Sequence, residues 1–269
     1  MSLPDGPVLL VGAGRMGQAL IQGWRRSGAI DPKRLIIVSP NEKPEVTAAV
    51  HAGARFNPPD AALAEAKTVV FCVKPFKRVE AAEALVSKLA PDAVIISVIV
   101  GVPVEAISAL FDGRRVARVL PTTGVARAEG VTAVFGTDAE ALARTHALFD
   151  PISATVDLPE EQMMDAAGAV SASGVAYVYA FAQALDDAAK AAGLPSEIAR
   201  ALSRATVTSA AGMMEETGAE PEVLIEQVAS PAGTTRAALA VLRGEQGIEP
   251  LLRETVAAAI RRSKELAVS

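Results

Sequence analysis

The sequence predicts a two-domain α/β protein in which a doubly wound parallel sheet is followed by an all-α domain. The first part alternates short apolar runs with helix-like stretches, a pattern typical of a parallel sheet with helices on both faces. A glycine-rich turn follows the first apolar run. After "VDLPEEQ" the apolar runs give way to long Ala-rich stretches with Gly or Pro at their breaks. We therefore expect a sheet domain over residues 1–157 and a helical domain over residues 158–269.

Six segments of the first domain are predicted to be strands. They are "PVLLVG" (7–12), "RLIIVS" (34–39), "TVVFCV" (68–73), "AVIISVI" (93–99), "RVARVL" (115–120) and "VTAVFG" (131–136). The first four are continuous apolar runs, as expected for strands that are covered on both faces. In the second domain we expect helices over roughly 160–192, 195–217, 220–229, 232–243 and 246–267.

The composition indicates a small-molecule enzyme of the cytoplasm. The net charge is −5 and the 26 basic residues are scattered, which argues against nucleic acid or an anionic membrane as a partner. A single cysteine, Cys72, excludes an internal disulfide and a cysteine-based zinc site. Two isolated histidines, His51 and His146, argue against a histidine-rich metal centre, so no metal site is predicted. The N-terminal residues lack the pattern of a signal peptide.

One segment has no charged residue between Asp165 and Asp186. This stretch, "AAGAVSASGVAYVYAFAQAL" (166–185), is about long enough to cross a bilayer, but it is dominated by Ala, Gly and Ser rather than Leu, Ile and Phe. We expect it to be buried against other helices. That burial can lie within one subunit or between the subunits of a homo-oligomer.

The glycine-rich turn predicts a Rossmann-type dinucleotide site. In "VLLVGAGRMGQAL", Gly12, Gly14 and Gly17 follow a strand and open a helix with the spacing G-x-G-x-x-G. Gly12 permits the tight turn, Gly14 lets backbone amides approach a pyrophosphate, and Gly17 allows close packing of helix on strand. The alternative is a glycine-rich turn that binds no ligand.

The end of the second strand favours NADP(H) over NAD(H). A NAD site usually has an acidic side chain there, for the ribose 2′-hydroxyl. Here the strand ends in Ser39, Pro40 and Asn41, which do not repel a 2′-phosphate, and Lys43 follows. NAD(H) stays possible, and the three residues can also be read as a simple turn.

A second helix start carries an unusual cluster of hydroxyl groups. "QVASPAGTTRAAL" (227–239) places Ser230, Thr234 and Thr235 around a proline and Gly233, just before an apolar run. An ordinary helix cap needs one hydroxyl. Amides at a helix N-terminus, joined by hydroxyls, suit an anion such as a carboxylate. A plain cap and turn is the alternative reading.

Taken together, these motifs resemble the pyrroline-5-carboxylate reductase family over almost the whole chain. The resemblance rests on "VGAGRMGQAL", "VKP" at 73–75, "ISVIVGV" (96–102), "AVSASGVAY" (169–177) and, most specifically, "VASPAGTTRAAL" (228–239). It implies a Rossmann domain followed by a helical dimerisation domain, and thus a homodimer or a higher homo-oligomer. It also implies reduction of 1-pyrroline-5-carboxylate to L-proline by hydride transfer from NAD(P)H.

Residue by residue, the resemblance assigns a cofactor site and a substrate site. The cofactor-binding residues would be Gly12, Ala13, Gly14, Arg15, Met16, Gly17, Ser39, Asn41, Asn57, Val73, Lys74 and Pro75. The substrate carboxylate would be held by Ser230, Gly233, Thr234 and Thr235, and Thr235 would also orient the ring as the catalytic residue. From pattern alone, Lys74 reads as an ordinary surface lysine and Asn57 as a turn residue.

Three departures from the family pattern concern the substrate more than the fold. Thr122 and Gly124 stand where the family has Asn and Pro, Val175 stands where it has Pro, and Ala232 replaces the first glycine of its signature pair. Two other functions are therefore kept open. One is an NADP-dependent reductase of a different cyclic imine or oxo acid, and the other is a dinucleotide-binding regulatory protein without turnover.

Overall fold

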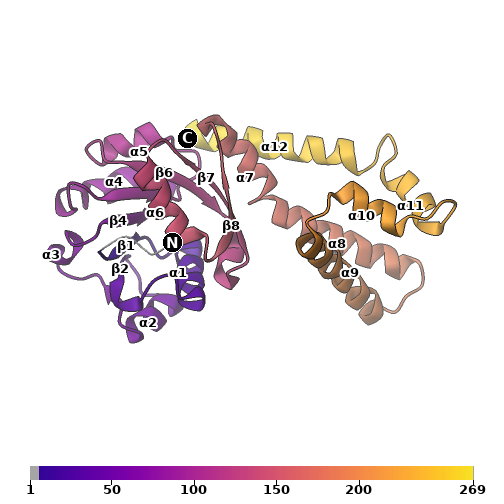
Figure 1. The fold of residues 1–269 in the computed structure, drawn as a ribbon, viewed down its shortest axis with the longest axis horizontal. Coiled ribbons are helices and arrows are strands. Elements are labelled where there is room, and N and C mark those ends of the chain that lie inside the picture. Colours follow the sequence, from indigo (N-terminus) through magenta and orange to yellow (C-terminus); the bar gives the residue numbers. More distant parts are fainter. Residues whose placement is uncertain (1–5, 269) are drawn as a thin grey trace. The chain divides into compact units, whose positions relative to one another are not determined.

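The structure, a computed structural model, describes residues 6–268 and contains two compact units (Figure 1). The first unit comprises residues up to Ala172 together with the chain from Ile260 onward, and the second comprises Ser173–Ala259. The predicted domain boundary at residue 157 lies inside the first unit, at the end of its last strand. This boundary stays a prediction, since compactness does not show which segment folds independently.

An eight-stranded sheet forms the centre of the first unit, with the order β3-β2-β1-β4-β5-β6-β7-β8. All six predicted strands are present. The strands are β1 (Val8–Val11), β2 (Leu35–Val38), β3 (Arg55–Phe56), β4 (Thr68–Phe71), β5 (Val94–Ser97), β6 (Val116–Pro121), β7 (Gly130–Gly136) and β8 (Ser153–Asp157). β3 and β8 were not predicted, because β3 has only two residues and β8, "SATVD", has no apolar run.

Helices cover both faces of this sheet, as the apolar strands predicted. One face packs against α1 (Arg15–Ser27), α2 (Pro44–His51) and α6 (Ala139–Phe149), with Trp24 at the centre of this core. The other face packs against α3 (Asp60–Leu63), α4 (Arg78–Glu83) and α5 (Val104–Leu110), where Phe71 and Phe111 meet edge to face. The buried Trp24 indole donates to the carbonyl of Leu148 at 2.9 Å and so ties α1 to α6.

The sheet is parallel from β3 to β6, and then its direction reverses. β7 pairs antiparallel with β6, and β8 runs parallel to β7. The reason lies in the link between β6 and β7, which consists of residues 122–129 with a 3₁₀ turn at Thr123–Arg127. A parallel crossover needs a dozen or more residues, so this short link returns the chain in the opposite direction.

His146 on α6 links that helix to the edge strand β8. Its ring nitrogens Nδ1 and Nε2 lie 2.9 Å from an Asp150 oxygen and 3.1 Å from an Asp157 oxygen. Burial lowers the pKa of His146, but the hydrogen bonds and charges of Asp150 and Asp157 outweigh it and raise this pKa above its ordinary value. The protonated ring can donate to both carboxylates, so it holds α6 and β8 together.

This arrangement predicts a pH-dependent contribution to stability. Because the pKa of His146 is raised on folding, its contribution is complete below the unfolded-state pKa of about 6.5 and is lost as pH rises through the folded-state value. We expect His146→Gln to lower the melting temperature by roughly 1–2 °C at pH 6, a small effect because both carboxylates are well exposed to solvent. At pH 9 the difference should vanish. An equal loss at both pH values, measured by calorimetry, would show that the ring acts through packing alone.

The second unit is all helical. Its helices are α8 (Gly174–Ala191), α9 (Ser196–Thr217), α10 (Pro221–Val228), α11 (Thr234–Leu242) and the part of α12 (Ile248–Val268) that precedes Ile260. The single helix predicted over 160–192 is wrong. The chain forms a 3₁₀ turn (Glu161–Met163), α7 (Met164–Val170) and α8, with a break at residues 171–173. At this break the Ser171 hydroxyl donates to the Ala167 carbonyl at 2.7 Å, a bond that Thr145 and Thr255 also make inside unbroken helices, so it does not by itself explain the break.

The uncharged segment gives α8 an exposed apolar surface within the single chain. Val178, Tyr179 and Phe181 are 48%, 69% and 42% exposed. Among the residues described, no helix is long and apolar enough to span a membrane. The sequence left open whether these side chains are buried within one subunit. In the single chain they are exposed.

Candidate functional site

The glycine turn between β1 and α1 has the close contacts that its spacing predicts. Gly12 has a φ of +97°, and a Cβ there would lie 2.4 Å from the carbonyl oxygen of Cys72. A Cβ on Gly17 would lie 2.1 Å from the carbonyl oxygen of Gly12. Neither distance is compatible with a side chain, so both positions require glycine for the packing of α1 on the sheet.

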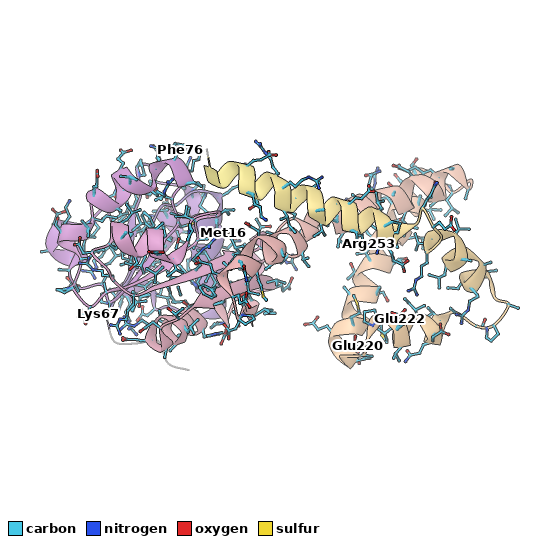
Figure 2. The ribbon with its side chains drawn as sticks, turned by 90° about the horizontal axis from the view of Figure 1, so that it is seen from above. Met16, Lys67, Phe76, Glu220, Glu222 and Arg253 are labelled. Atoms are coloured by element: carbon cyan, nitrogen blue, oxygen red, sulfur yellow. The ribbon has the colours of Figure 1, made fainter. Side chains whose placement is uncertain are left out.

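Gly14 differs from its two neighbours in the motif. It precedes α1, no side chain caps it, and an added Cβ would meet no atom within 4 Å. The helix start is therefore exposed and has no side-chain cap, and uncapped amides at a helix N-terminus suit an anion. Arg15 is exposed beside it, and Met16, labelled in Figure 2, is half-buried in the first turn of α1.

Hydrogen bonds join the glycine turn to the end of β2. The Ser39 hydroxyl is buried and accepts a hydrogen bond from the Ala13 amide at 3.3 Å. The Asn57 side chain accepts from the Ser39 amide at 3.0 Å and donates to its carbonyl at 2.9 Å. Asn57 has a φ of +43°, a conformation that asparagine tolerates better than most residues. The structure thus brings Ala13, Ser39 and Asn57 into one network.

A cavity of about 470 Å³ opens beside this network. Gly12, Ser39, Asn57 and Val73 line it, so four of the predicted cofactor residues share one space. Pro40, which the sequence placed at the end of the second strand, also lines it, whereas the sequence did not single out other wall residues such as Pro58, Lys77, Ala81 and Leu85. The lining combines apolar side chains with the polar Ser39 and Asn57 and with charged side chains, a mixture that suits a heterocycle joined to a ribose. Asn41, Lys74 and Pro75 do not line this cavity.

The end of β4 leads into an exposed turn. Lys74 precedes a short 3₁₀ turn (Pro75–Lys77), and its Nζ lies 5.7 Å from the ring centre of Phe76, which is 74% exposed and labelled in Figure 2. Burial raises the pKa of the nearby Cys72 thiol to about 12, which disfavours the thiolate form.

The second predicted site lies in the loop between α10 and α11. Gly233 is the first residue before α11 and has no side-chain cap. A Cβ on Gly233 would lie 2.5 Å from the Ser230 hydroxyl oxygen, so this hydroxyl sits directly over the helix start. In the described part of the chain, the hydroxyls of Ser230, Thr234 and Thr235 make no hydrogen bond to protein. The Gly233 amide donates to the Ser230 carbonyl at 3.1 Å, so the loop offers the amides of the first helical turn and three hydroxyls without a partner among the described residues.

Arg236 and Glu226 hold this loop in shape, and the sequence did not reveal them. The Arg236 guanidinium donates to both carboxylate oxygens of Glu226, at 2.9 and 2.7 Å, and also to the Ala229 carbonyl. The pair joins α10 to α11 across the loop. Similarly, Arg243 at the end of α11 donates to Glu222 at 3.0 Å and Glu249 at 2.8 Å. Figure 2 labels Glu222 at the start of α10.

The family departure at Thr122 and Gly124 has a local structural explanation. The Thr122 hydroxyl is buried and accepts a hydrogen bond from the Val131 amide at 2.9 Å. A Cβ on Gly124 would lie 2.6 Å from the Glu129 carbonyl oxygen, so the turn after β6 needs glycine there. Ala232 has a φ of +56°, a left-handed conformation that a glycine would adopt without strain. Nothing in the structure explains Val175.

The predicted cofactor-binding residues and the predicted substrate-binding residues lie in different units of the chain. Those of the glycine turn and the ends of β2 and β4 lie in the first unit, and Ser230, Gly233, Thr234 and Thr235 lie in the second. Their roles as ligands stay predictions. None of the described residues forms a cluster of His, Cys, Asp or Glu that could hold a metal ion.

The fold and the glycine turn define a class of protein, the dinucleotide-dependent oxidoreductases built on a Rossmann-type sheet. Residues 7–101 match the family model "NADP oxidoreductase coenzyme F420-dependent", and residues 161–266 match "Pyrroline-5-carboxylate reductase dimerisation". A pyrroline-5-carboxylate reductase of Arabidopsis thaliana is 34% identical over 265 residues, which cover 96% of this chain and 95% of the relative. The chain belongs to the pyrroline-5-carboxylate reductase family.

Solved structures agree with this assignment. A pyrroline-5-carboxylate reductase from Coxiella burnetii superimposes with a TM-score of 0.89 at 26% identity, and the match covers 98% of this chain and 99% of that one. The pyrroline carboxylate reductase of Plasmodium falciparum, solved with NADP bound, shares the fold with a TM-score of 0.82 at 21% identity. That match covers 98% of this chain and 99% of the other.

Proposed function

We propose that this chain reduces 1-pyrroline-5-carboxylate to L-proline with NAD(P)H as the hydride donor. The observation that carries this proposal is the α10–α11 loop, where the Ser230 hydroxyl lies close to Gly233 at an uncapped helix start and two threonines form the first turn. Family membership over nearly the whole chain supports it. A loop of this kind suits a substrate that carries a carboxylate beside its reacting bond.

The residues present fit a dinucleotide cofactor. The open space at Gly14 leaves room for a diphosphate at the start of α1, and the cavity beside Gly12 leaves room for the adenosine end. When bound, the cofactor supplies a hydride from its nicotinamide ring. The chain's own part is to hold the diphosphate at Gly14 and to keep the adenosine end against the Ser39–Asn57 network.

The substrate side of the reaction depends on orientation rather than on a strong acid. Ser230, Gly233 and Thr234 are proposed to fix the carboxylate, and the Thr235 hydroxyl to orient the ring. A protonated imine accepts hydride readily, so alignment accounts for most of the rate enhancement that the protein must provide. The pair of Arg236 and Glu226 acts on the substrate only indirectly, by holding the loop.

The activity can be tested directly. We expect the purified protein to oxidise NADPH when 1-pyrroline-5-carboxylate is added, and proline to form in equal amounts. Absence of turnover with this substrate, together with turnover of another cyclic imine or an oxo acid, would replace the proposed substrate. Cofactor binding without any turnover would instead indicate a regulatory protein.

We also propose that NADPH is preferred over NADH. The end of β2 carries no acidic side chain, and Asn41 there is exposed, whereas the Ser39 hydroxyl is occupied by the Ala13 amide. Asn41→Asp should therefore repel a 2′-phosphate without disturbing the turn. We expect kcat/KM for NADPH to fall about ten-fold while that for NADH changes little, as steady-state kinetics with both cofactors would show. A wild-type preference for NADH would contradict the proposal.

A homo-oligomer that assembles through the helical unit is the third part of the proposal. Because Tyr179 on α8 is 69% exposed in the single chain, Tyr179→Glu should leave the subunit folded. In an oligomer it would bury an unpaired charge, so light scattering should show dissociation. Val156→Glu, which changes an exposed residue of β8, serves as the control and should not dissociate the protein. A folded, active wild-type monomer would refute this part.

A further inference from the structure

A second cavity of the first unit is lined by charged side chains that the proposed reaction does not use. Its volume is about 440 Å³, and its walls include Arg118 of β6, Glu161 and Gln162 of the 3₁₀ turn, Asp165 of α7 and Lys264 of α12. It shares no lining residue with the cavity beside Gly12. We call it the Arg118 cavity.

Arg118 is buried in this wall, and most of the N–H groups of its guanidinium have no acceptor among the described residues. The residue is 5% exposed, and its only hydrogen bond within the described structure runs from Nη1 to Glu161 Oε1 at 2.6 Å. The Nε atom is buried and has no partner. Because a buried donor without an acceptor is unfavourable, an acceptor that enters the cavity would be bound favourably.

Glu161 is already committed to protein partners. The same oxygen that accepts from Arg118 also accepts from the Val104 amide at 2.7 Å. Arg118 and Glu161 therefore form a neutral pair that fixes the start of the 3₁₀ turn against β6 and α5. The Arg118 guanidinium therefore keeps N–H donors that this pair does not use. A ligand with acceptor oxygens would satisfy them.

Lys264 and Asp165 provide the two remaining charges. Lys264 is exposed and forms no ion pair among the described residues. Asp165 accepts from the Ser263 hydroxyl at 2.7 Å through Oδ1, and its Oδ2 has no partner in the described part of the chain. The two positive residues of the lining, Arg118 and Lys264, balance the two negative ones, Glu161 and Asp165, so the net charge of the lining is zero. A simple anion would leave the cavity with a net charge, whereas a ligand with one charge of each sign would not.

We propose that the Arg118 cavity binds a free α-amino acid as its zwitterion. The carboxylate lies between the Arg118 guanidinium and Lys264, and the ammonium group faces Asp165. Pro103 and Met164 supply an apolar wall for the side chain. This inference is independent of the proposed reaction, because the site shares no residue with either predicted ligand site.

Isothermal titration calorimetry on the full chain, without cofactor, can test this with three matched probes. L-Valine carries both charges, 3-methylbutanoate lacks the ammonium group, and 2-methylpropylamine lacks the carboxylate. We expect valine to bind at least ten-fold more tightly than either fragment. Equal binding of 3-methylbutanoate would show a plain anion site and overturn the proposal, as would the absence of any valine binding.

Two charge reversals on α12 locate the binding site. Lys264→Glu should weaken valine binding about ten-fold, because the new carboxylate repels that of the ligand. Arg261→Glu changes the net charge by the same amount on an exposed residue outside the cavity, so it should leave the affinity unchanged. Equal effects of the two variants would overturn the proposal. So would loss of valine binding in Thr235→Val, since the ligand would then sit on the α10–α11 loop.

Discussion

Replacing Thr235 by valine should lower kcat/KM for 1-pyrroline-5-carboxylate roughly ten- to a hundred-fold. Valine keeps the shape of threonine but has no hydroxyl, so the substrate loses one hydrogen bond to a charged group. Such a bond contributes about 1.5–3 kcal/mol, which corresponds to this fall in kcat/KM. Steady-state kinetics at saturating NADPH would measure it.

The same variant should leave the fold and the cofactor site unaffected. The Thr235 hydroxyl is exposed and makes no hydrogen bond to described residues, so the melting temperature should change little. NADPH affinity, followed by fluorescence titration, should also stay the same, because the predicted diphosphate site is the start of α1. Thr208→Val, which removes an exposed hydroxyl from α9, is the matched control and should retain full activity. If Thr235→Val weakened NADPH binding alone, the loop would be a cofactor contact.

Alanine substitutions at Gly14 and Gly17 should have opposite consequences, although the two glycines belong to one motif. At Gly14 a Cβ meets no protein atom within 4 Å, so Gly14→Ala should fold normally. The added methyl group would occupy the space proposed for the diphosphate. We therefore expect the dissociation constant for NADPH to rise at least about ten-fold, with little change in melting temperature.

Gly17→Ala should instead destabilise the protein. Its Cβ would lie 2.1 Å from the Gly12 carbonyl oxygen, a distance that forces α1 away from the end of β1. Overpacking of this kind costs about 2–3 kcal/mol, or roughly 5–10 °C in melting temperature. Thermal unfolding followed by circular dichroism would separate the two variants. A destabilised Gly14→Ala with normal NADPH affinity would show that this glycine serves packing and not the cofactor.

Local sequence patterns were sufficient for most of the fold. The apolar runs predicted six of the eight strands, and the four that are apolar throughout gave the clearest signal because helices cover both of their faces. The spacing of Gly12, Gly14 and Gly17 predicted the turn, because the motif is contiguous in the chain, although the contact that requires glycine at position 12 comes from the distant Cys72 carbonyl. The same holds for the start of α11, where Gly233 and its flanking hydroxyls adjoin one another in the chain.

Several features of the fold were not predicted, because the local sequence carries little sign of them. β8 lacks an apolar run and is held at the edge of the sheet by its pairing with β7. The break between α7 and α8 lies in a stretch of small residues whose composition favours helix, so nothing in the local pattern marks it. The reversal of the sheet at β7 follows from the length of a link, which becomes meaningful only once β6 and β7 are known to pair.

The sequence by itself determined the fold class, the family and the two helix starts that we propose as ligand sites, since all of these depend on residues close together in the chain. Only the tertiary structure decided which polar groups are already occupied. Ser39 faces Ala13, Arg236 faces Glu226, and Arg118 faces Glu161, with partners that are 10 to 43 residues apart. A hydrogen bond between distant residues leaves no periodic trace in the sequence, because it requires only that two side chains meet after the backbone has folded.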